Sequence, residues 1–230
     1  MSSSQPQIPD PLAIGDVHVM LPTADRAGAG VVYGLLLGEP EGDRWAASNA
    51  TVGLVESGPL TVDLQVADLP GSVGLLRRRG LAVTDGEHGT AALDDAVPLR
   101  ITDRAHRRPA ARMLDHIVLT VGDADRALAL FGGRLGINLR LVRDLGGGAS
   151  QLFFRTTSAV IEVVTGTTDP ADGIGLMGLA WRSDDIDVER ARLHEAGLDV
   201  SEVRVGRKRG TRVCTLREPA LGTATLLIQQ

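Results

Sequence analysis

DVHVMLPTADRAGAGVVYGLLLGEP at residues 16–40 aligns without a gap to LDHIVLTVGDADRALALFGGRLGIN at residues 114–138, and this self-similarity decides the fold. The alignment pairs His18 with His116, 98 residues further along the chain. Each stretch is typical of an alternating strand, a helix that an aspartate can cap, and a glycine that ends the helix. The chain therefore contains an internal duplication.

A second pair of similar stretches extends the duplication. DLPGSVGLLRRRGLAV at 68–83 aligns to DIDVERARLHEAGLDV at 185–200, now at an offset of 117 residues. Because the offset has grown, we expect the first copy to lack about one strand and its connections. The predicted domains are residues 12–104 and 114–230, joined by a polar, Arg-rich linker at 105–113.

The second copy shows the order of its elements most clearly. Asp123 can cap a helix with one apolar stripe, formed by Ala124, Leu128, Phe131 and Leu135. Three strands follow it, separated by turns rich in Gly or Thr, so this half reads as βαβββ. The remainder repeats that order, and the second copy is expected to contain two βαβββ halves.

Composition supports an α+β class with many short strands. The chain has 28 Gly and 11 Pro, with 43% hydrophobic and 23% charged residues, which is typical of a folded, turn-rich protein. A net charge of −5 and only two Trp, one Tyr and three Phe supply neither phosphate neutralisation nor base stacking. Nucleic acid is therefore not an expected partner.

The sequence also argues against a membrane partner. Its most apolar stretch, VVYGLLLG at 31–38, is much shorter than the roughly 20 residues of a spanning helix. Cys214 is the one cysteine, so no intrachain disulfide can form, and no basic-then-apolar leader opens the chain. We expect a cytoplasmic location and an inert buried thiol at Cys214. Exposed edge strands make a homodimer a reasonable expectation.

Three stretches of the second copy, LDHIVLTVGDADRALALF from 114, AVIEVV from 159 and GTRVCTLREPALGTATLLI from 210, resemble the vicinal oxygen chelate superfamily. This superfamily contains glyoxalases, bleomycin-resistance proteins and extradiol dioxygenases. The likeness is close over 114–230 and weaker over 12–104. It implies tandem glyoxalase-like domains in which paired βαβββ modules form a cup.

The resemblance also implies where a metal would bind. Members with metal centres use four strand positions, which fall here on His116, Glu162, Gly178 and Leu226. In the first copy the matching positions are His18, Gly53, Thr61 and Leu99. Neither set restores three ligands, which a transition metal normally needs, so we expect no metal and no other cofactor. The remaining histidines do not repair the site, because we place His88 in a hairpin, His106 in the linker and His194 on a solvent-facing helix position.

Strand alternation directs His116 and Glu162 into the cup, where they can touch. Three interpretations stay open: a hydrogen-bonded structural pair, an acid/base pair in which the carboxylate orients the imidazole, and a weak metal site completed by substrate. His18 has Gly53 in place of a carboxylate and is expected to be structural. The other residues predicted to line the cup beside the pair are Val118, Thr120 and Val164.

Arginines suggest the charge of a ligand. Arg155 and Arg182 each end a strand and are candidates for the wall of the cup, while Trp181 should pack under a helix. Five cations crowd the hairpin VRVGRKRGTRV, as Arg204, Arg207, Lys208, Arg209 and Arg212. This hairpin reads either as a solvated tip or as an attractant for a carboxylate or phosphate.

Two classes of function follow from these observations. The leading hypothesis is a metal-independent protein that binds a small anionic molecule, either a sequestering or resistance-type binder or a lyase or isomerase using His116 and Glu162. The alternative is a metal-dependent enzyme of the glyoxalase or extradiol-dioxygenase type. The missing third and fourth ligands argue against this alternative, and the identity of the ligand cannot be read from the sequence.

Overall fold

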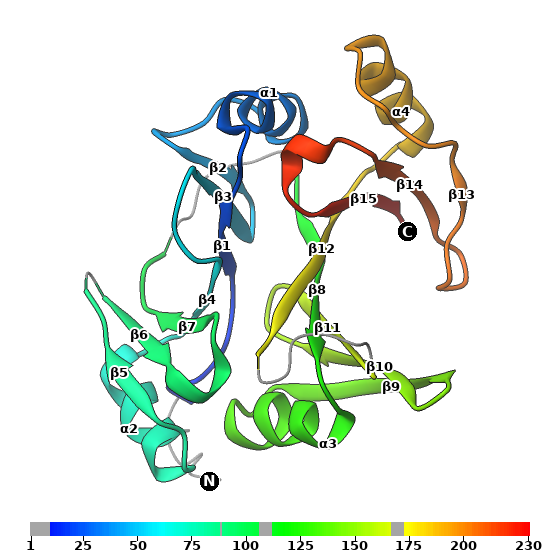
Figure 1. Ribbon diagram of the computed structural model, residues 1–230. Helices are drawn as coiled ribbons and strands as arrows, with labels where there is room; N and C mark the ends of the chain where they lie inside the picture. The colour runs from blue at the N-terminus through cyan, green and yellow to red at the C-terminus, as the bar shows by residue number, and fades with distance from the viewer. Residues whose placement is uncertain (1–9, 88, 106–111, 167–172) are drawn as a thin grey trace, which may run out of the picture.

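The computed structural model describes residues 10–87, 89–105, 112–166 and 173–230, which form two mixed sheets lying side by side (Figure 1). The first sheet has the strand order β2-β3-β1-β4-β7-β6-β5 and the second the order β13-β14-β15-β12-β8-β11-β10-β9. The first sheet uses only strands of the first copy and the second only strands of the second copy. The predicted α+β class with two tandem modules is confirmed.

The first sheet and its helices comprise β1 (Val17–Pro22), α1 (Arg26–Leu37), β2 (Arg44–Ala47), β3 (Ala50–Val55), β4 (Thr61–Gln65), α2 (Leu69–Arg78), β5 (Val83–Asp85), β6 (Thr90–Leu93), η1 (Asp94–Ala96) and β7 (Leu99–Thr102). The second comprises β8 (Leu114–Val121), α3 (Ala124–Ala127), η2 (Leu128–Arg134), β9 (Asn138–Gly146), β10 (Ala149–Arg155), β11 (Val160–Thr165), β12 (Gly175–Arg182), α4 (Ile186–Glu195), β13 (Arg204–Val205), β14 (Arg212–Leu216), η3 (Pro219–Leu221) and β15 (Ala224–Gln229).

The strand missing from the first copy is the counterpart of β9. In both sheets the first strand runs parallel to the last strand of its half, as β1 with β3 and β8 with β11. The strand that precedes this last strand in the chain pairs antiparallel with it, as β2 with β3 and β10 with β11. β9 extends the second sheet by one further strand at its edge. The predicted trimming of the first copy after its first helix is confirmed.

The helix after β8 differs from its predicted form. Asp123 caps it as expected, by accepting a hydrogen bond from the Arg126 amide at 2.7 Å. Only α3 is α-helical, however, and the chain continues through η2 as a π-helix. The wider turn rotates the buried face, so that Leu128 is 37% exposed while Ala127, Leu130 and Phe131 are buried. The predicted position of Leu128 in the apolar stripe is wrong.

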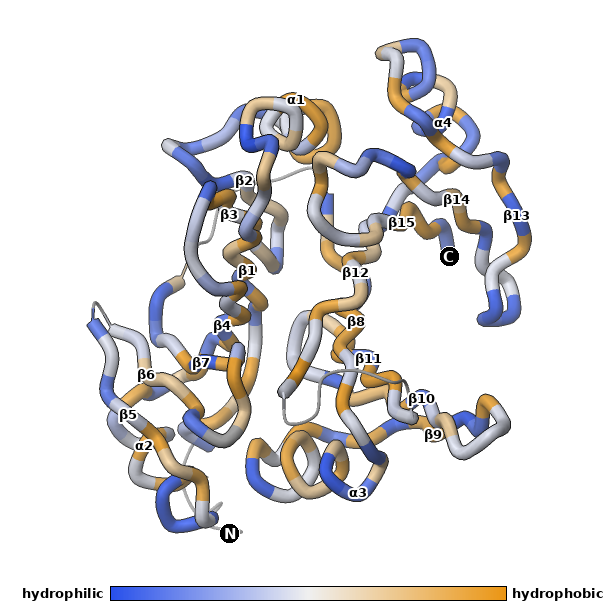
Figure 2. Tube along the Cα trace, in the orientation of Figure 1, coloured by the Kyte–Doolittle hydropathy of each residue, from blue (hydrophilic) through white to orange (hydrophobic). Residues whose placement is uncertain are grey.

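One continuous hydrophobic core joins the two sheets, because buried residues of both copies form a single cluster. Trp181 is fully buried in this cluster, as predicted. Cys214 is also fully buried, and burial raises the pKa of its thiol to about 11. Figure 2 shows the contrasting hydrophilic character of α4 and of the hairpin that follows it.

Some expectations fall outside these elements. The first strand after α4, which the repeated βαβββ order leads us to expect, is short: residues 198–205 form only β13 and an isolated bridge between Val200 and Leu216. His88 and His106 lie outside the described residues, as does most of the expected linker. Within the described part of the chain, none of the helices has the length and apolar character needed to cross a membrane.

Candidate functional site

One face of the second sheet carries the predicted site residues. Ile117, Leu119 and Val121 of β8 are fully buried in the core, so alternation directs His116, Val118 and Thr120 to the opposite face. On the neighbouring strand β11 the same face receives Val160, Glu162 and Val164. We call this the cup face, and the five site residues predicted on β8 and β11 all lie on it: His116, Val118, Thr120, Glu162 and Val164.

The cup face has an apolar half. Ala180, Val213 and Ile228 form a small buried cluster with Leu226 that is separate from the main core. Ala180 lies opposite His116 across the β8–β12 pairing and beside Leu226 across the β12–β15 pairing. His116 therefore has hydrocarbon on one side and polar groups on the other.

His116 and Glu162 lie close together, although not at hydrogen-bond distance. Nε2 of His116 is 3.7 Å from Oε2 of Glu162, and the side chains are 16% and 11% exposed. The two groups attract one another when the imidazole is protonated, but the gap is too long for a direct hydrogen bond. Glu162 is thus near the imidazole without being the group that orients it.

The carboxylate within hydrogen-bond distance of His116 belongs to a residue that the sequence pattern did not indicate. Asp115 Oδ2 lies 2.9 Å from His116 Nδ1. Strict alternation would place Asp115 on the core face, but the β8–β12 register jumps between Ala180–His116 and Trp181–Leu114, which makes Asp115 the extra residue of a β-bulge. The bulge brings Asp115 onto the same face as His116, and the alternation of apolar and polar residues does not reveal it.

Asp115 is held by further donors. Arg182 Nε donates to its Oδ1 at 2.9 Å, and Gln230 Nε2 donates to the same oxygen at 2.5 Å. Burial acts to raise the pKa of the Asp115 carboxyl, but the hydrogen bonds and charges of His116 and Arg182 outweigh it and hold that pKa below its ordinary value. Asp115 is therefore ionised at neutral pH. Gln230 in turn accepts a hydrogen bond from Lys208 Nζ at 2.8 Å.

Glu162 has its own chain of partners toward the sheet edge. Gln151 of β10 donates from Nε2 to Glu162 Oε1. Arg143 of β9 donates from Nη1 to Gln151 Oε1 at 3.0 Å, and its guanidinium carbon lies 5.5 Å from the centre of the Phe153 ring. Sequence alternation could have placed Gln151 on this face, but it does not identify an amide as a partner of Glu162.

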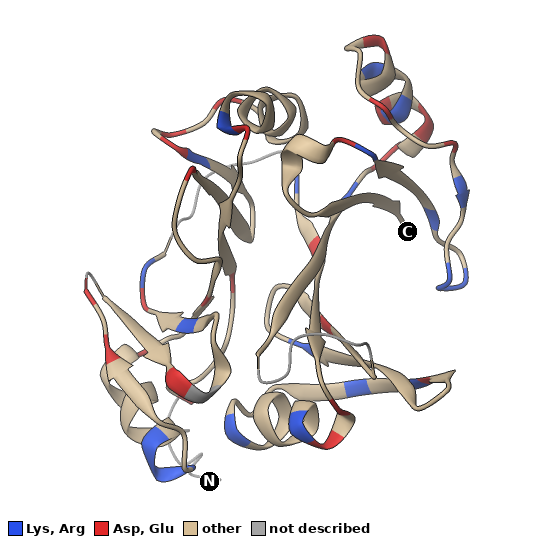
Figure 3. Ribbon diagram, viewed as in Figure 1, with Lys and Arg blue, Asp and Glu red and all other residues tan. Residues whose placement is uncertain are grey.

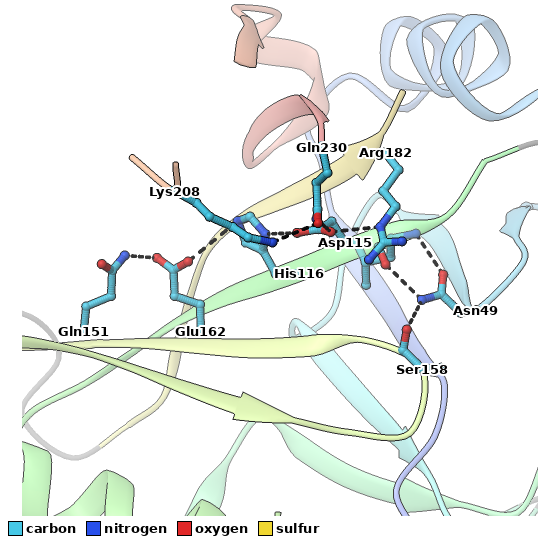
Figure 4. A network of polar contacts seen from close by, with 10 residues as sticks. Asn49, Asp115, His116, Gln151, Ser158, Glu162, Arg182, Lys208 and Gln230 are labelled. Atoms are coloured by element: carbon cyan, nitrogen blue, oxygen red, sulfur yellow. Dashed lines mark hydrogen bonds and ion pairs between the residues drawn. The ribbon is translucent and has the colours of Figure 1, made fainter. Parts of the chain in front are cut away.

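These contacts form a continuous chain, most of which Figure 4 shows. We call it the cup network; its members are Arg143, Gln151, Glu162, His116, Asp115, Arg182, Gln230 and Lys208. Arg143, Arg182 and Lys208 give it three positive charges, against the two carboxylates Asp115 and Glu162. The network therefore has an excess of positive charge around an imidazole.

Figure 3 shows positive charge gathered at the tip of the hairpin between β13 and β14. The hairpin connects to the cup network through Lys208, which donates to Gln230 (Figure 4). Arg212 of the same hairpin does not join the network. Its two terminal nitrogens donate to the Asp187 carboxylate of α4 at 2.5 and 2.8 Å. Arg155, predicted for the wall, lies exposed at the end of β10, and its side chain makes no hydrogen bond or ion pair with the described residues. Of the two predicted wall arginines, only Arg182 joins the cup network.

The donor set does not fit a transition-metal centre. The third and fourth family positions are Gly178 and Leu226, and a Cβ added to Gly178 would lie 2.9 Å from the backbone oxygen of Ala224. Among the residues that the structure describes, no three or more His, Cys, Asp or Glu side chains group so as to hold a metal ion. A histidine at position 178 would require the backbone of β15 to move.

The first sheet corrects one predicted position. β12 and β15 pair Ala180 with Leu226, and the equivalent strands β4 and β7 pair Asp63 with Arg100. The counterpart of Leu226 is therefore Arg100, not Leu99, which points into the core on the opposite face. A shift of one residue changes the face of a strand position.

Arg100 binds Asp63 through two hydrogen bonds, of 2.6 and 2.7 Å. His18 is 3% exposed, and its Nδ1 lies 3.0 Å from Thr51 Oγ1. The first copy thus has no counterpart of the paired His116 and Glu162, because Gly53 occupies the carboxylate position.

A separate groove of about 800 Å³ runs between α4 and β13, and Arg190, His194 and Glu202 are among its lining residues. None of the residues predicted to line the cup lines this groove, although Arg204 of the cationic hairpin does. Arg190 already binds the Glu202 carboxylate and the Ser201 carbonyl oxygen within it. The cup network, with its oriented imidazole, is therefore the stronger candidate site.

Comparison with known proteins agrees with this fold. Residues 115–215 match the family model described as the Glyoxalase/Bleomycin resistance protein/Dioxygenase superfamily. A mutant 4-hydroxymandelate synthase from Streptomyces coelicolor superposes with a TM-score of 0.67 and 15% identity, over 96% of this chain and 93% of that chain. This likeness shows the fold of the whole two-sheet chain.

Other solved structures match about half of the chain. Methylmalonyl-CoA epimerase from Mycobacterium tuberculosis is 21% identical over 51% of this chain and 87% of that chain, with a TM-score of 0.43. The Streptomyces coelicolor epimerase is 20% identical over 51% of this chain and 96% of that chain, with a TM-score of 0.42. No curated protein matches the chain in sequence.

Proposed function

Since residues 115–215 belong to the glyoxalase, bleomycin-resistance and dioxygenase superfamily, we propose that this protein binds a small, partly hydrophobic anion on the cup face of its second sheet, without a transition metal. The observation that carries the proposal is the cup network, where an oriented imidazole lies between an apolar cluster and an excess of cations. Small-molecule sites commonly combine apolar walls with a few fixed polar groups.

The cations define the charge of the ligand. Arg182 uses Nε to bind Asp115, and its side chain is 42% exposed, so its terminal nitrogens remain available to a carboxylate or phosphate. Lys208 brings the cationic hairpin to the same end of the network. The hairpin would then attract an anion toward the cup face rather than serve only as a solvated tip.

Bound ligand would contact His116 and Glu162. A sequestering binder needs only these contacts, whereas a lyase or isomerase would also use the imidazole and the carboxylate to move a proton. The two alternatives differ in turnover: an enzyme converts its ligand and loses that activity in His116→Ala, and a binder returns the ligand unchanged. The first copy, residues 12–104, would act as a supporting domain, and we retain the cytoplasmic location and a homodimer as parts of this proposal.

The test is a binding screen of carboxylates and phosphate monoesters, aromatic and aliphatic, followed by thermal stability and by titration calorimetry. Hits should bind about tenfold more weakly to His116→Ala and to Glu162→Gln, a loss of about 1.4 kcal/mol. His194→Ala is a matched control, because His194 lies exposed on α4 outside the network. Unchanged affinity in both site variants, or a ligand located on the first sheet, would refute the proposal.

A further inference from the structure

The bulge in β8 places Asp115 against one ring nitrogen of His116 and leaves the other ring nitrogen free to face the site. Asp115 contacts His116 at Nδ1, while the other ring nitrogen, Nε2, is directed toward Glu162. We propose that Asp115 is a positioning residue that holds neutral His116 as the Nδ1–H tautomer, so that Nε2 offers a lone pair to a hydroxyl group of the bound anion. The ligand part of this inference rests on the proposed function, whereas the tautomer does not.

The hydrogen-bond inventory around Asp115 requires this tautomer. An ionised carboxylate only accepts hydrogen bonds, and a neutral imidazole carries its proton on one nitrogen alone. Arg182 and Gln230 both donate to Oδ1, which leaves Oδ2 to face His116 Nδ1 at 2.9 Å. Nδ1 must therefore be the donor, and Nε2 becomes the acceptor.

Glu162 makes the opposite side of the imidazole a place for a proton donor. Its Oε1 already accepts a hydrogen bond from Gln151, and its Oε2 lies 3.7 Å from Nε2. A lone pair and a carboxylate oxygen that face one another repel unless a donor lies between them or beside both. A ligand hydroxyl beside both groups can share its one proton between Nε2 and Oε2 in a bifurcated hydrogen bond, which relieves this repulsion.

The surrounding charges choose among the possible donors. A ligand ammonium group would be attracted by Glu162, but the three cations at the two ends of the network outnumber its two carboxylates and oppose a further positive charge. A hydroxyl group carries no such penalty, and an adjacent carboxylate can bind the guanidinium of Arg182. The geometry therefore narrows the ligand class to hydroxylated, partly hydrophobic carboxylates.

The tautomer is tested directly by ¹⁵N NMR of the histidine rings in the intact protein, at a pH above the imidazole titration. Wild type should show the Nδ1–H form at His116, and Asp115→Ala should shift the ring toward Nε2–H. Arg182→Gln is the matched control, because it removes a donor to Asp115 but keeps the contact with His116. An Nε2–H ring in wild type, or no change in a folded Asp115→Ala variant, would overturn the role of Asp115.

The hydroxyl is tested with two probes that differ only there, 3-phenyllactate and 3-phenylpropionate. Wild type should bind phenyllactate about tenfold more tightly, because unmatched acceptors in a site penalise the analogue that lacks the hydroxyl. Glu162→Gln should reduce this preference. Equal binding of the two probes overturns the hydroxyl assignment alone. If neither probe binds, the narrower ligand class is wrong, while the proposed function is still decided by the wider screen of carboxylates and phosphate monoesters, and the NMR result still decides the role of Asp115.

Discussion

The side chain of Asn49, in the turn between β2 and β3 of the first sheet, makes hydrogen bonds to the backbone of Leu114 in the second sheet through both ends of its amide. Nδ2 donates to the Leu114 carbonyl oxygen at 2.9 Å, and the Leu114 amide donates to Oδ1 at 2.8 Å. Nδ2 also donates to the Ser158 carbonyl oxygen at 3.0 Å. Leu114 is the residue before Asp115, so one buried amide links the first sheet to the bulge that positions the site.

Asn49→Ala should lower the free energy of unfolding by about 2–3 kcal/mol, because it leaves a buried amide and two carbonyl groups without their partner. Chemical denaturation of the variant measures this loss. The neighbouring Ser48→Ala is the control, since Ser48 is exposed and its contact to Arg112 uses only the backbone amide. Equal stability of the two variants would show that Asn49 is not a significant link between the sheets.

Position 178 requires glycine because the backbone of Ala224 lies too close for a Cβ, and not because of an unusual backbone conformation. Gly178→Ala should destabilise the protein by about 1–3 kcal/mol, because the new Cβ meets a backbone oxygen at 2.9 Å. Gly34→Ala in α1 is the contrasting variant, since nothing lies within 4 Å of its Cβ position. Removing a helical glycine there should raise stability by about 0.5–1 kcal/mol. If Gly178→Ala leaves stability unchanged, β15 can move to accept a side chain, and a metal-binding residue could be introduced at position 178.

Much of the fold could be predicted from the sequence because the duplication repeats strong local signals. Asp25 and Asp123 cap their helices at equivalent places, with hydrogen bonds from Gly28 and Arg126. The alternation in β8 and β11 also directs His116 and Glu162 to one face. These features depend on short-range periodicity and capping, which a single sequence displays.

The remaining features depend on pairing between strands. The bulge at Asp115 follows from the register of β8 against β12, and the assignment of Arg100 in place of Leu99 follows from the pairing of β7 with β4. The π-helical turn that exposes Leu128 depends on how η2 packs. None of these features can be recognised from the alternation of apolar and polar residues. A change in strand register or in helix type moves side chains to another face, although the sequence pattern stays the same.

Glu189 should make stability depend on pH. It binds Arg112 and Arg192, and although burial acts to raise the pKa of its carboxyl, those two guanidinium groups hold the pKa below its ordinary value of 4.5. A depressed carboxyl pKa stabilises the fold above the unfolded-state value, and this contribution disappears as the pH falls through the folded-state value. Glu189→Gln should therefore cost about 1–2 kcal/mol at neutral pH and much less below pH 4.5.

Denaturation of wild type and Glu189→Gln across the acid range measures this difference. Asp199→Asn is the matched control. Asp199 Oδ1 lies 3.8 Å from Arg217 Nη1, and both side chains are 61% exposed. An exposed pair of this kind contributes little at any pH. A constant difference between wild type and Glu189→Gln at all pH values would contradict the assignment.

Protein purified without added metal should carry no stoichiometric transition metal. The reason is the donor set, in which Gly178 and Leu226 stand at two ligand positions and leave one imidazole and one carboxylate. Elemental analysis of wild type and His116→Ala checks it. Near one equivalent of Zn, Fe, Ni or Mn in wild type, lost in His116→Ala, would favour the metal-dependent alternative.

The hydrophilic character of α4 has a consequence for the kinetics of local opening. Only Ile186 and Leu193 of this helix are buried, whereas α1 buries Ala29, Val32, Tyr33 and Leu36. Little apolar surface is therefore exposed when α4 detaches, and its ion pairs to Arg112 and Arg212 can be replaced by water. In native-state hydrogen exchange, the amides of α4 should open as a unit well below the global unfolding free energy, while those of α1 exchange only when the whole core is lost.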